Sequence, residues 1–273
     1  ARARRIAAAD EDPPDSRYAV AMAVFYARRA SAAKTIGRMD QRLADLRTAL
    51  SYSEKSGVRQ PSIWRALAGA EANAGNYLNA IEQLTRVLEV EPGNLSAYKS
   101  LVAMKVRVGD LGGAHQTKRA FLAASSRKQN QDPWQAIHEA RIEWVLLTAE
   151  GRFAEAEPFH RREIEIFLGA GQFDRYPQWL DNTSQELSRN LRRQGRLMEA
   201  EVLARDALVR ALRRLGKFSP PGVFLTRELG AVLYAQGRYE EAEALVRASI
   251  DIAGEIGLSR GNISLMLARR ILG

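Results

Sequence analysis

The chain has 273 residues, of which 46% are hydrophobic, and its 41 lysine and arginine residues outnumber 32 acidic ones to give a net charge of +9. The absence of cysteine excludes disulfides, thiolate metal sites and a cysteine nucleophile. No apolar run approaches the roughly 20 residues of a membrane-spanning helix, so we expect no membrane insertion and a soluble chain, cytoplasmic or, after removal of a signal peptide, periplasmic. The basic charge indicates acidic or nucleic-acid partners, or else only the enrichment in alanine and arginine that a GC-rich genome produces.

The N-terminal region contains two predicted segments. Residues 1–15 include the acidic, proline-containing stretch Asp10–Asp15 and are expected to be a disordered or extended lead-in. Residues 16–57 are expected to form a degenerate capping hairpin, because Gly37–Leu50 has helical apolar spacing but Arg42 replaces a small residue found in later copies. Terminal repeats that cap a stack are usually atypical.

A glycine followed five residues later by an alanine recurs along the chain. The five copies are Gly75–Ala80, Gly109–Ala114, Gly151–Ala156, Gly195–Ala200 and Gly237–Ala242, and their glycines are 34, 42, 44 and 42 residues apart. Periods of this size are typical of solenoids built from helical hairpins. Such solenoids mostly present a binding surface.

The segment Pro61–Asn94 carries the most complete repeat. Counted from Pro61, it has Trp64 at position 4, Leu67 at 7, Ala68 at 8, Gly75 at 15, Tyr77 at 17, Ala80 at 20 and Pro92 at 32. This pattern strongly resembles the tetratricopeptide repeat. Small residues at positions 8 and 20 let two helices approach closely, and the glycine can end the first helix in a left-handed conformation.

The later repeats are longer. The segment ALRRLGKFSPP, which precedes the fifth copy of the glycine-to-alanine pattern at Gly237–Ala242, resembles the 42-residue kinesin-light-chain-like variant of this repeat. The resemblance implies an all-α, right-handed superhelical solenoid of about six stacked antiparallel hairpins plus a terminal helix. The expected units are 61–94, 95–128, 135–170, 179–216 and 221–257, followed by 261–273. The last segment is predicted to be a capping helix or the first helix of a truncated repeat. Its apolar face is a candidate interface, including for a homodimer.

No catalytic or cofactor motif is found in the sequence, so we predict that this chain is not an enzyme and has no cofactor. His160 and Glu163 have the i, i+3 spacing that could place two metal ligands on one helix face. A metal site needs further converging ligands, and none can be assigned, so no metal is predicted.

The resemblance implies a concave groove lined by the first helix of each hairpin. The predicted groove residues are Arg65, Asn73, Lys99, Arg107, Arg141, Arg189, Arg227, Tyr234 and Arg269. Arginine forks match carboxylates or phosphates bidentately, which favours an acidic ligand. The alternative is that each arginine pairs with an acid on a neighbouring helix, such as Glu71 or Glu186, and only packs the stack.

Three functions remain open. The preferred one is a protein-interaction scaffold, a fragment of a larger protein, that binds an acidic or extended peptide in the basic groove. The second is the recognition arm of a bacterial effector or CHAT-like protease whose catalytic domain lies outside this chain. The third is a helical-repeat RNA binder, which is disfavoured because stacking platforms for bases are scarce.

Overall fold

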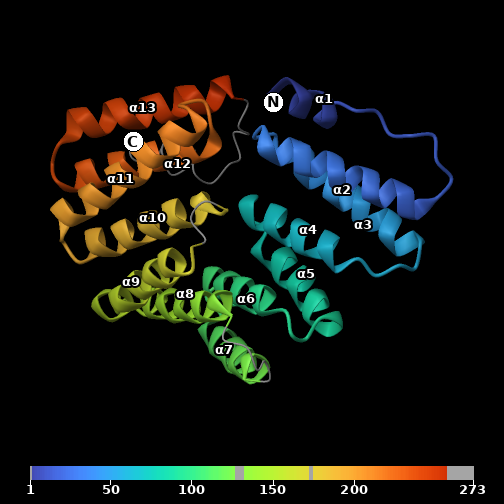
Figure 1. The fold of residues 1–273 in the computed structure, drawn as a ribbon, viewed down its shortest axis with the longest axis horizontal. Helices are drawn as coiled ribbons and strands as arrows, with labels where there is room; N and C mark the ends of the chain where they lie inside the picture. Colours follow the sequence, from blue (N-terminus) through green and yellow to red (C-terminus); the bar gives the residue numbers. More distant parts are fainter. Residues whose placement is uncertain (1, 127–131, 172–174, 257–273) are drawn as a thin grey trace.

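This computed structural model describes residues 2–126, 132–171 and 175–256. All regular elements within these ranges are α-helices, thirteen in total, stacked as hairpins in chain order (Figure 1). They are α1 (Arg2–Ala9), α2 (Ala19–Thr35), α3 (Met39–Lys55), α4 (Pro61–Asn73), α5 (Tyr77–Val90), α6 (Leu95–Arg107), α7 (Leu111–Ser125), α8 (Pro133–Ala149), α9 (Phe153–Gly169), α10 (Pro177–Arg193), α11 (Leu197–Leu215), α12 (Pro220–Ala235) and α13 (Tyr239–Glu255). The predicted all-α solenoid is confirmed. The predicted terminal helix at 261–273 lies outside the described residues.

Each even-numbered helix from α2 to α12 is the first helix of a hairpin and packs against the helix that follows it. The second helix then packs on the first helix of the next hairpin, except that α8 packs mainly against α6 rather than α7. The stack curls, so that in Figure 1 the first and last hairpins both lie above the middle ones. None of the helices within the described ranges has the length and hydrophobicity needed to cross a bilayer.

The turn glycine of each hairpin closes the first helix. Gly195, for example, has φ +78°, a left-handed conformation that side chains with a Cβ rarely adopt. Its amide donates to the carbonyl of Arg192 at 3.1 Å, and the next amide, of Arg196, donates to Leu191 at 3.0 Å. These two bonds form a Schellman motif, which satisfies carbonyls at the helix end.

The alanine five residues after each turn glycine lies where the two helices of the hairpin meet. All five, Ala80, Ala114, Ala156, Ala200 and Ala242, have no exposed surface. The approach is close at Gly230 on α12, where an added Cβ would lie 3.3 Å from the carbonyl oxygen of Ala242 and 2.9 Å from a methyl group of Val246. Small residues are therefore a steric requirement of the hairpin.

The expected lead-in at 1–15 is partly wrong, because residues Arg2–Ala9 form α1, which packs against α2. Alanine and arginine are strong helix formers, and Ala9 is buried in the contact. Its carbonyl accepts a hydrogen bond from the side chain of Gln41 at 2.5 Å. The acidic residues Asp10–Asp15 have no regular structure.

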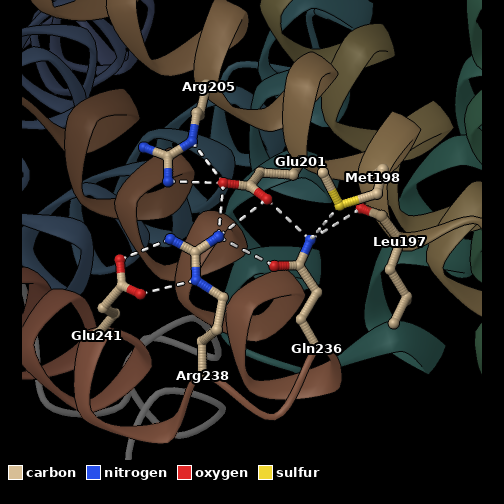
Figure 2. A network of polar contacts seen from close by, with 7 residues as sticks. All are labelled: Leu197, Met198, Glu201, Arg205, Gln236, Arg238 and Glu241. Atoms are coloured by element: carbon tan, nitrogen blue, oxygen red, sulfur yellow. Dashed lines mark hydrogen bonds and ion pairs between the residues drawn. The ribbon is translucent and has the colours of Figure 1, made fainter.

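A polar network joins the fifth hairpin to the sixth (Figure 2). Glu201 on α11 accepts hydrogen bonds from Arg238 at 3.0 Å and from Gln236 at 2.8 Å, which flank the turn glycine of the sixth hairpin. Arg238 also binds Glu241 with both arms of its guanidinium, at 2.7 and 2.6 Å, and Arg205 binds Glu201 from its own helix at 2.7 Å. The side chains on both sides of the turn thus fix the register between hairpins.

Close packing at the alanine positions leads to a stability prediction. Ala242→Leu should lower the free energy of unfolding by about 1–3 kcal/mol, because the larger side chain overfills the contact with α12. The exposed Ala244 on the same helix is the control, and Ala244→Leu should change it by less than about 0.5 kcal/mol. Urea denaturation followed by circular dichroism measures both. Equal losses for the two variants would contradict the packing argument.

Candidate functional site

The structure places the predicted groove residues at very different depths. Arg65, Asn73, Arg107 and Tyr234 are exposed, Lys99, Arg141 and Arg189 are half-buried, Arg227 is buried, and Arg269 lies outside the described residues. The described residues among them all belong to first helices, α4 to α12. Their different depths give them different electrostatic roles.

Glu163 on α9 has no exposed surface and is the centre of a polar cluster. Its carboxylate accepts hydrogen bonds from Arg141, from the indoles of Trp144 at 2.8 Å and Trp179 at 2.9 Å, and from the Thr183 hydroxyl at 3.0 Å. These donors belong to α8 and α10, so the carboxylate links two successive hairpins. A buried carboxylate is tolerated only with such a full set of partners.

An aromatic cluster lies beside this carboxylate, at the first turns of α8 and α10. The ring centroid of Trp134 is 5.0 Å from that of Trp179 and 5.3 Å from that of Tyr176, both in edge-to-face arrangements. His138 lies 6.2 Å from Trp134. The two tryptophans and Tyr176 are half-buried, so the cluster combines apolar surface with access to solvent.

Lys99 on α6 reaches across to this cluster. Its Nζ lies 5.6 Å from the ring centroid of Trp179, and the guanidinium of Arg141 lies 4.4 Å from the same ring. Within the described part of the chain, Lys99 makes no ion pair with a carboxylate. Burial, and then the charge of Arg141, lower the pKa of Lys99 to about 8. An anion placed beside Lys99 would therefore relieve an unfavourable charge.

A second cluster lies between α10 and α12 around the buried Glu228. Arg189 donates to Glu228 at 2.7 Å and to Glu186 at 2.7 Å, whereas the guanidiniums of Arg192 and Arg227 approach Glu228 only to 3.9 and 3.6 Å. Three guanidiniums share two carboxylates here. The cluster consequently carries one positive charge in excess.

Arg227 is placed differently from the contact residue that was predicted. It is only 5% exposed, its Nε has no hydrogen-bond partner among the described residues, and burial lowers its pKa. In this position it can act on a groove ligand through its charge but offers little surface for direct contact.

Pairing with acids of the stack applies to some of the predicted groove arginines and not to others. Arg141 and Arg189 pair with acids of the stack itself. Glu71 pairs with Arg47 at 2.9 Å and not with Arg65. Within the described residues, neither Arg65 nor Arg107 makes an ion pair.

The possible metal pair His160 and Glu163 is part of the packing. His160 is 1% exposed and stacks on Trp144 with ring centroids 4.3 Å apart, and burial lowers its pKa to about 3. Glu163 is held by the donors described above. In the described ranges, no three histidine, aspartate or glutamate side chains group as a metal site would require.

A hollow of about 480 Å³ opens on the side of the stack formed by second helices, between α7, α8 and α9. Two polar contacts cross it, His115 to Glu150 at 2.8 Å and Lys118 to Glu143 at 2.5 Å. It lies at the junction where α8 packs against α6. The charged groups in it are therefore already paired with one another.

Glu163, Trp179 and Glu228 set the charge and shape of the site but were not predicted as site residues. Glu163 was considered only as a metal ligand beside His160, although its place between the core positions His160 and Phe167 at helical spacing indicates burial. The sequence does not reveal which donors reach it, because they come from helices of two different hairpins.

Stacked helical hairpins with polar and aromatic clusters on their first helices define a helical-repeat protein of the solenoid class. The tetratricopeptide repeat family profile matches residues 180–255. This match covers the fifth and sixth hairpins and, together with the fold of the preceding hairpins, supports a tetratricopeptide-repeat protein.

Solved structures share this fold at low sequence identity. A tetratricopeptide repeat protein from Parabacteroides merdae has a TM-score of 0.60 at 12% identity, over 100% of this chain and 91% of that one. NprR in complex with its cognate peptide NprX has a TM-score of 0.56 at 16% identity, over 94% of this chain and 62% of that one. A putative kinesin light chain repeat protein from Podosopora anserina has a TM-score of 0.50 at 19% identity, over 74% of this chain and 100% of that one. A comparison with curated protein sequences gives no match.

The buried carboxylate of Glu163 provides a second stability prediction. Glu163→Gln should lower the free energy of unfolding by about 3 kcal/mol, because Arg141 then loses its buried counter-charge. The exposed Glu165 on the same helix is the control, and Glu165→Gln should have an effect below about 0.5 kcal/mol. Urea denaturation at neutral pH measures both, and equal stabilities would show that the carboxylate is not needed.

Proposed function

We propose that this chain is a non-enzymatic scaffold that binds an acidic, extended peptide segment along its first helices. The proposal rests mainly on the excess of positive charge there. With Lys99 counted beside Arg141, the clusters around Glu163 and Glu228 each contain more cations than carboxylates. Arg65 and Arg107, which have no ion pair within the described residues, add positive charge on α4 and α6. A row of such charges attracts a negatively charged segment and speeds its association.

The first helices also form one continuous surface in the middle of the stack. Arg141 of α8 donates to the Thr183 hydroxyl of α10 at 2.8 Å, and Lys99 of α6 reaches Trp179 of α10. Side chains of three successive first helices therefore meet, as expected on the inner side of a curved stack. This inner surface, from Arg65 to Tyr234, is the groove in which we place the peptide.

The aromatic cluster provides a site for an apolar or aromatic side chain of the peptide. Trp134, Tyr176 and Trp179 present half-buried rings next to Lys99. A peptide with an acidic residue beside an aromatic one could pair its carboxylate with Lys99 and stack its ring on the cluster. NprR, whose fold is similar, was solved with a peptide, which supports peptide binding in the same class of fold.

Reversal of the two exposed, unpaired arginines tests the groove. Arg65→Glu combined with Arg107→Glu should weaken binding of a fluorescent polyglutamate peptide containing one tryptophan by at least roughly tenfold at low salt, because two attractions become repulsions. Binding by the original chain should also weaken steeply as salt is raised. Fluorescence anisotropy measures both.

The control reverses two charges on second helices. Arg119 on α7 and Arg162 on α9 are exposed, so Arg119→Glu with Arg162→Glu gives the same change in net charge on the other side of the stack. This variant should keep most of the affinity. Equal weakening by both double variants would rule out a localised groove, and tighter binding of single-stranded RNA than of any acidic peptide would favour a nucleic-acid ligand.

Lys99 makes a pH prediction. A ligand carboxylate favours the charged ammonium and raises its pKa above the free value of about 8, so affinity should fall as pH rises through 8 and above. The stability of the free chain should change in the opposite direction, because the pKa of Lys99 is lower in the folded chain than in the unfolded one. The charged ammonium destabilises the fold fully below pH 8, and this effect disappears as the pH rises further. Peptide titrations from pH 6.5 to 9.5 measure the first trend, and Lys99→Arg should flatten it.

A further inference from the structure

In the last three hairpins, the turn and the first part of the second helix have the same sequence pattern. Gly-Arg-x-x-Glu-Ala-Glu-x-x-x-Arg occurs at 151–161, 195–205 and 237–247. In every copy the first arginine pairs with the first glutamate, and the second glutamate pairs with the last arginine one helical turn further on. The second glutamates are Glu157, Glu201 and Glu243.

The first two of these glutamates also receive the next hairpin. Glu157 accepts hydrogen bonds from Arg196 at 2.5 Å and Gln194 at 3.1 Å, as Glu201 does from Arg238 and Gln236. Their side chains are only 13% and 10% exposed as a result. Each glutamate therefore acts as the acceptor for a Gln-Gly-Arg turn.

Glu243 has the same position and internal pairing but lacks that turn. It is bound by Arg247 at 2.7 Å, and within the described ranges this is its one side-chain ion pair. Its side chain is 53% exposed. The outer face of α13 thus carries a preformed carboxylate acceptor with its orienting arginine in place.

We propose that this face of α13 is a docking surface for a further tetratricopeptide hairpin stacked in register, and that Glu243 selects hairpins whose turn reads Gln-Gly-Arg. The guanidinium and amide of such a turn would complete the same two contacts that Glu157 and Glu201 make. This surface is separate from the groove, and the proposal does not depend on peptide binding there.

A second copy of the chain fits this surface less well than an added hairpin. The turn of its first hairpin reads Ile36-Gly37-Arg38, so glutamine is missing, and Arg38 is already paired with Asp10. The turns at Gly195 and Gly237 have the right sequence, but each is enclosed by its own preceding hairpin.

The test is an extended chain in which a second copy of residues 220–256 follows residue 261, which places its turn glycine 42 residues after Gly237. The added hairpin should increase the helical circular dichroism signal and raise the melting temperature. Glu243→Gln should lower the melting temperature of the extended chain by about 2–4 °C and that of the original chain by less than about 1 °C. Replacing the arginine of the added turn by glutamine should cause the same loss, and the two changes together should cause no more.

The matched control is Glu240→Gln, because Glu240 is exposed on α13 but lies outside the pattern. It should affect the two chains equally. A charge swap, Glu243→Arg with glutamate in the added turn, should restore the melting temperature. Equal effects of Glu243→Gln on both chains, or an added hairpin that gains no helix with either charge arrangement, would overturn the proposal. Self-association of the original chain in a sedimentation experiment, if Glu243→Gln abolishes it, would also overturn the proposal. The occupant of the surface would then be a second copy of the chain.

Discussion

The close approach of two helices behind each turn glycine is the constraint on which the rest of the structure depends. It needs a residue in the left-handed conformation to reverse the chain and an alanine where the helices meet. Both are found in five of the six hairpins. The first hairpin has Arg42 at the alanine position, where it is 6% exposed and donates to the carbonyl of Ala66 at 3.2 Å. With hairpin geometry fixed, similar contacts recur between the fourth, fifth and sixth hairpins.

Electrostatics between hairpins follows from this regularity. Acidic side chains at the junctions, such as Glu163, Glu201 and Glu228, are buried and accept hydrogen bonds from adjacent hairpins, which for Glu201 and Glu228 come from arginines. Many of the arginines that make the chain basic are therefore structural. Positive charge remains available for a ligand where cations exceed carboxylates or, as at Arg65, where an arginine has no partner in the described part of the chain.

Much of the fold could be predicted from the sequence, and less of the site. The spacing and residue types of the recurring glycine-to-alanine pattern predicted the hairpins, because the turn conformation and the close approach of the two helices depend on residues near each other in the sequence. α1 was missed because the charged, alanine-rich start resembles a disordered tail, and its burial against α2 depends on tertiary contact. The position of Arg227 in the repeat predicted its helix but not its burial, which depends on the shapes of neighbouring side chains. Most junction pairs join residues about 20 to 40 positions apart, so no local pattern specifies them.

The hollow between α7 and α8 has a consequence for how the stack can bend. Eight residues before the turn glycine, the fifth and sixth hairpins have the buried Leu187 and Leu229, whereas the fourth has Glu143 paired with Lys118. Polar contacts across an open space resist separation less than packed leucines do. Bending at this junction would pivot on the inner contact between α6 and α8, beside Lys99. The two halves of the stack could then change their mutual angle, and with it the curvature of the proposed groove, while the charges at the pivot stay in place.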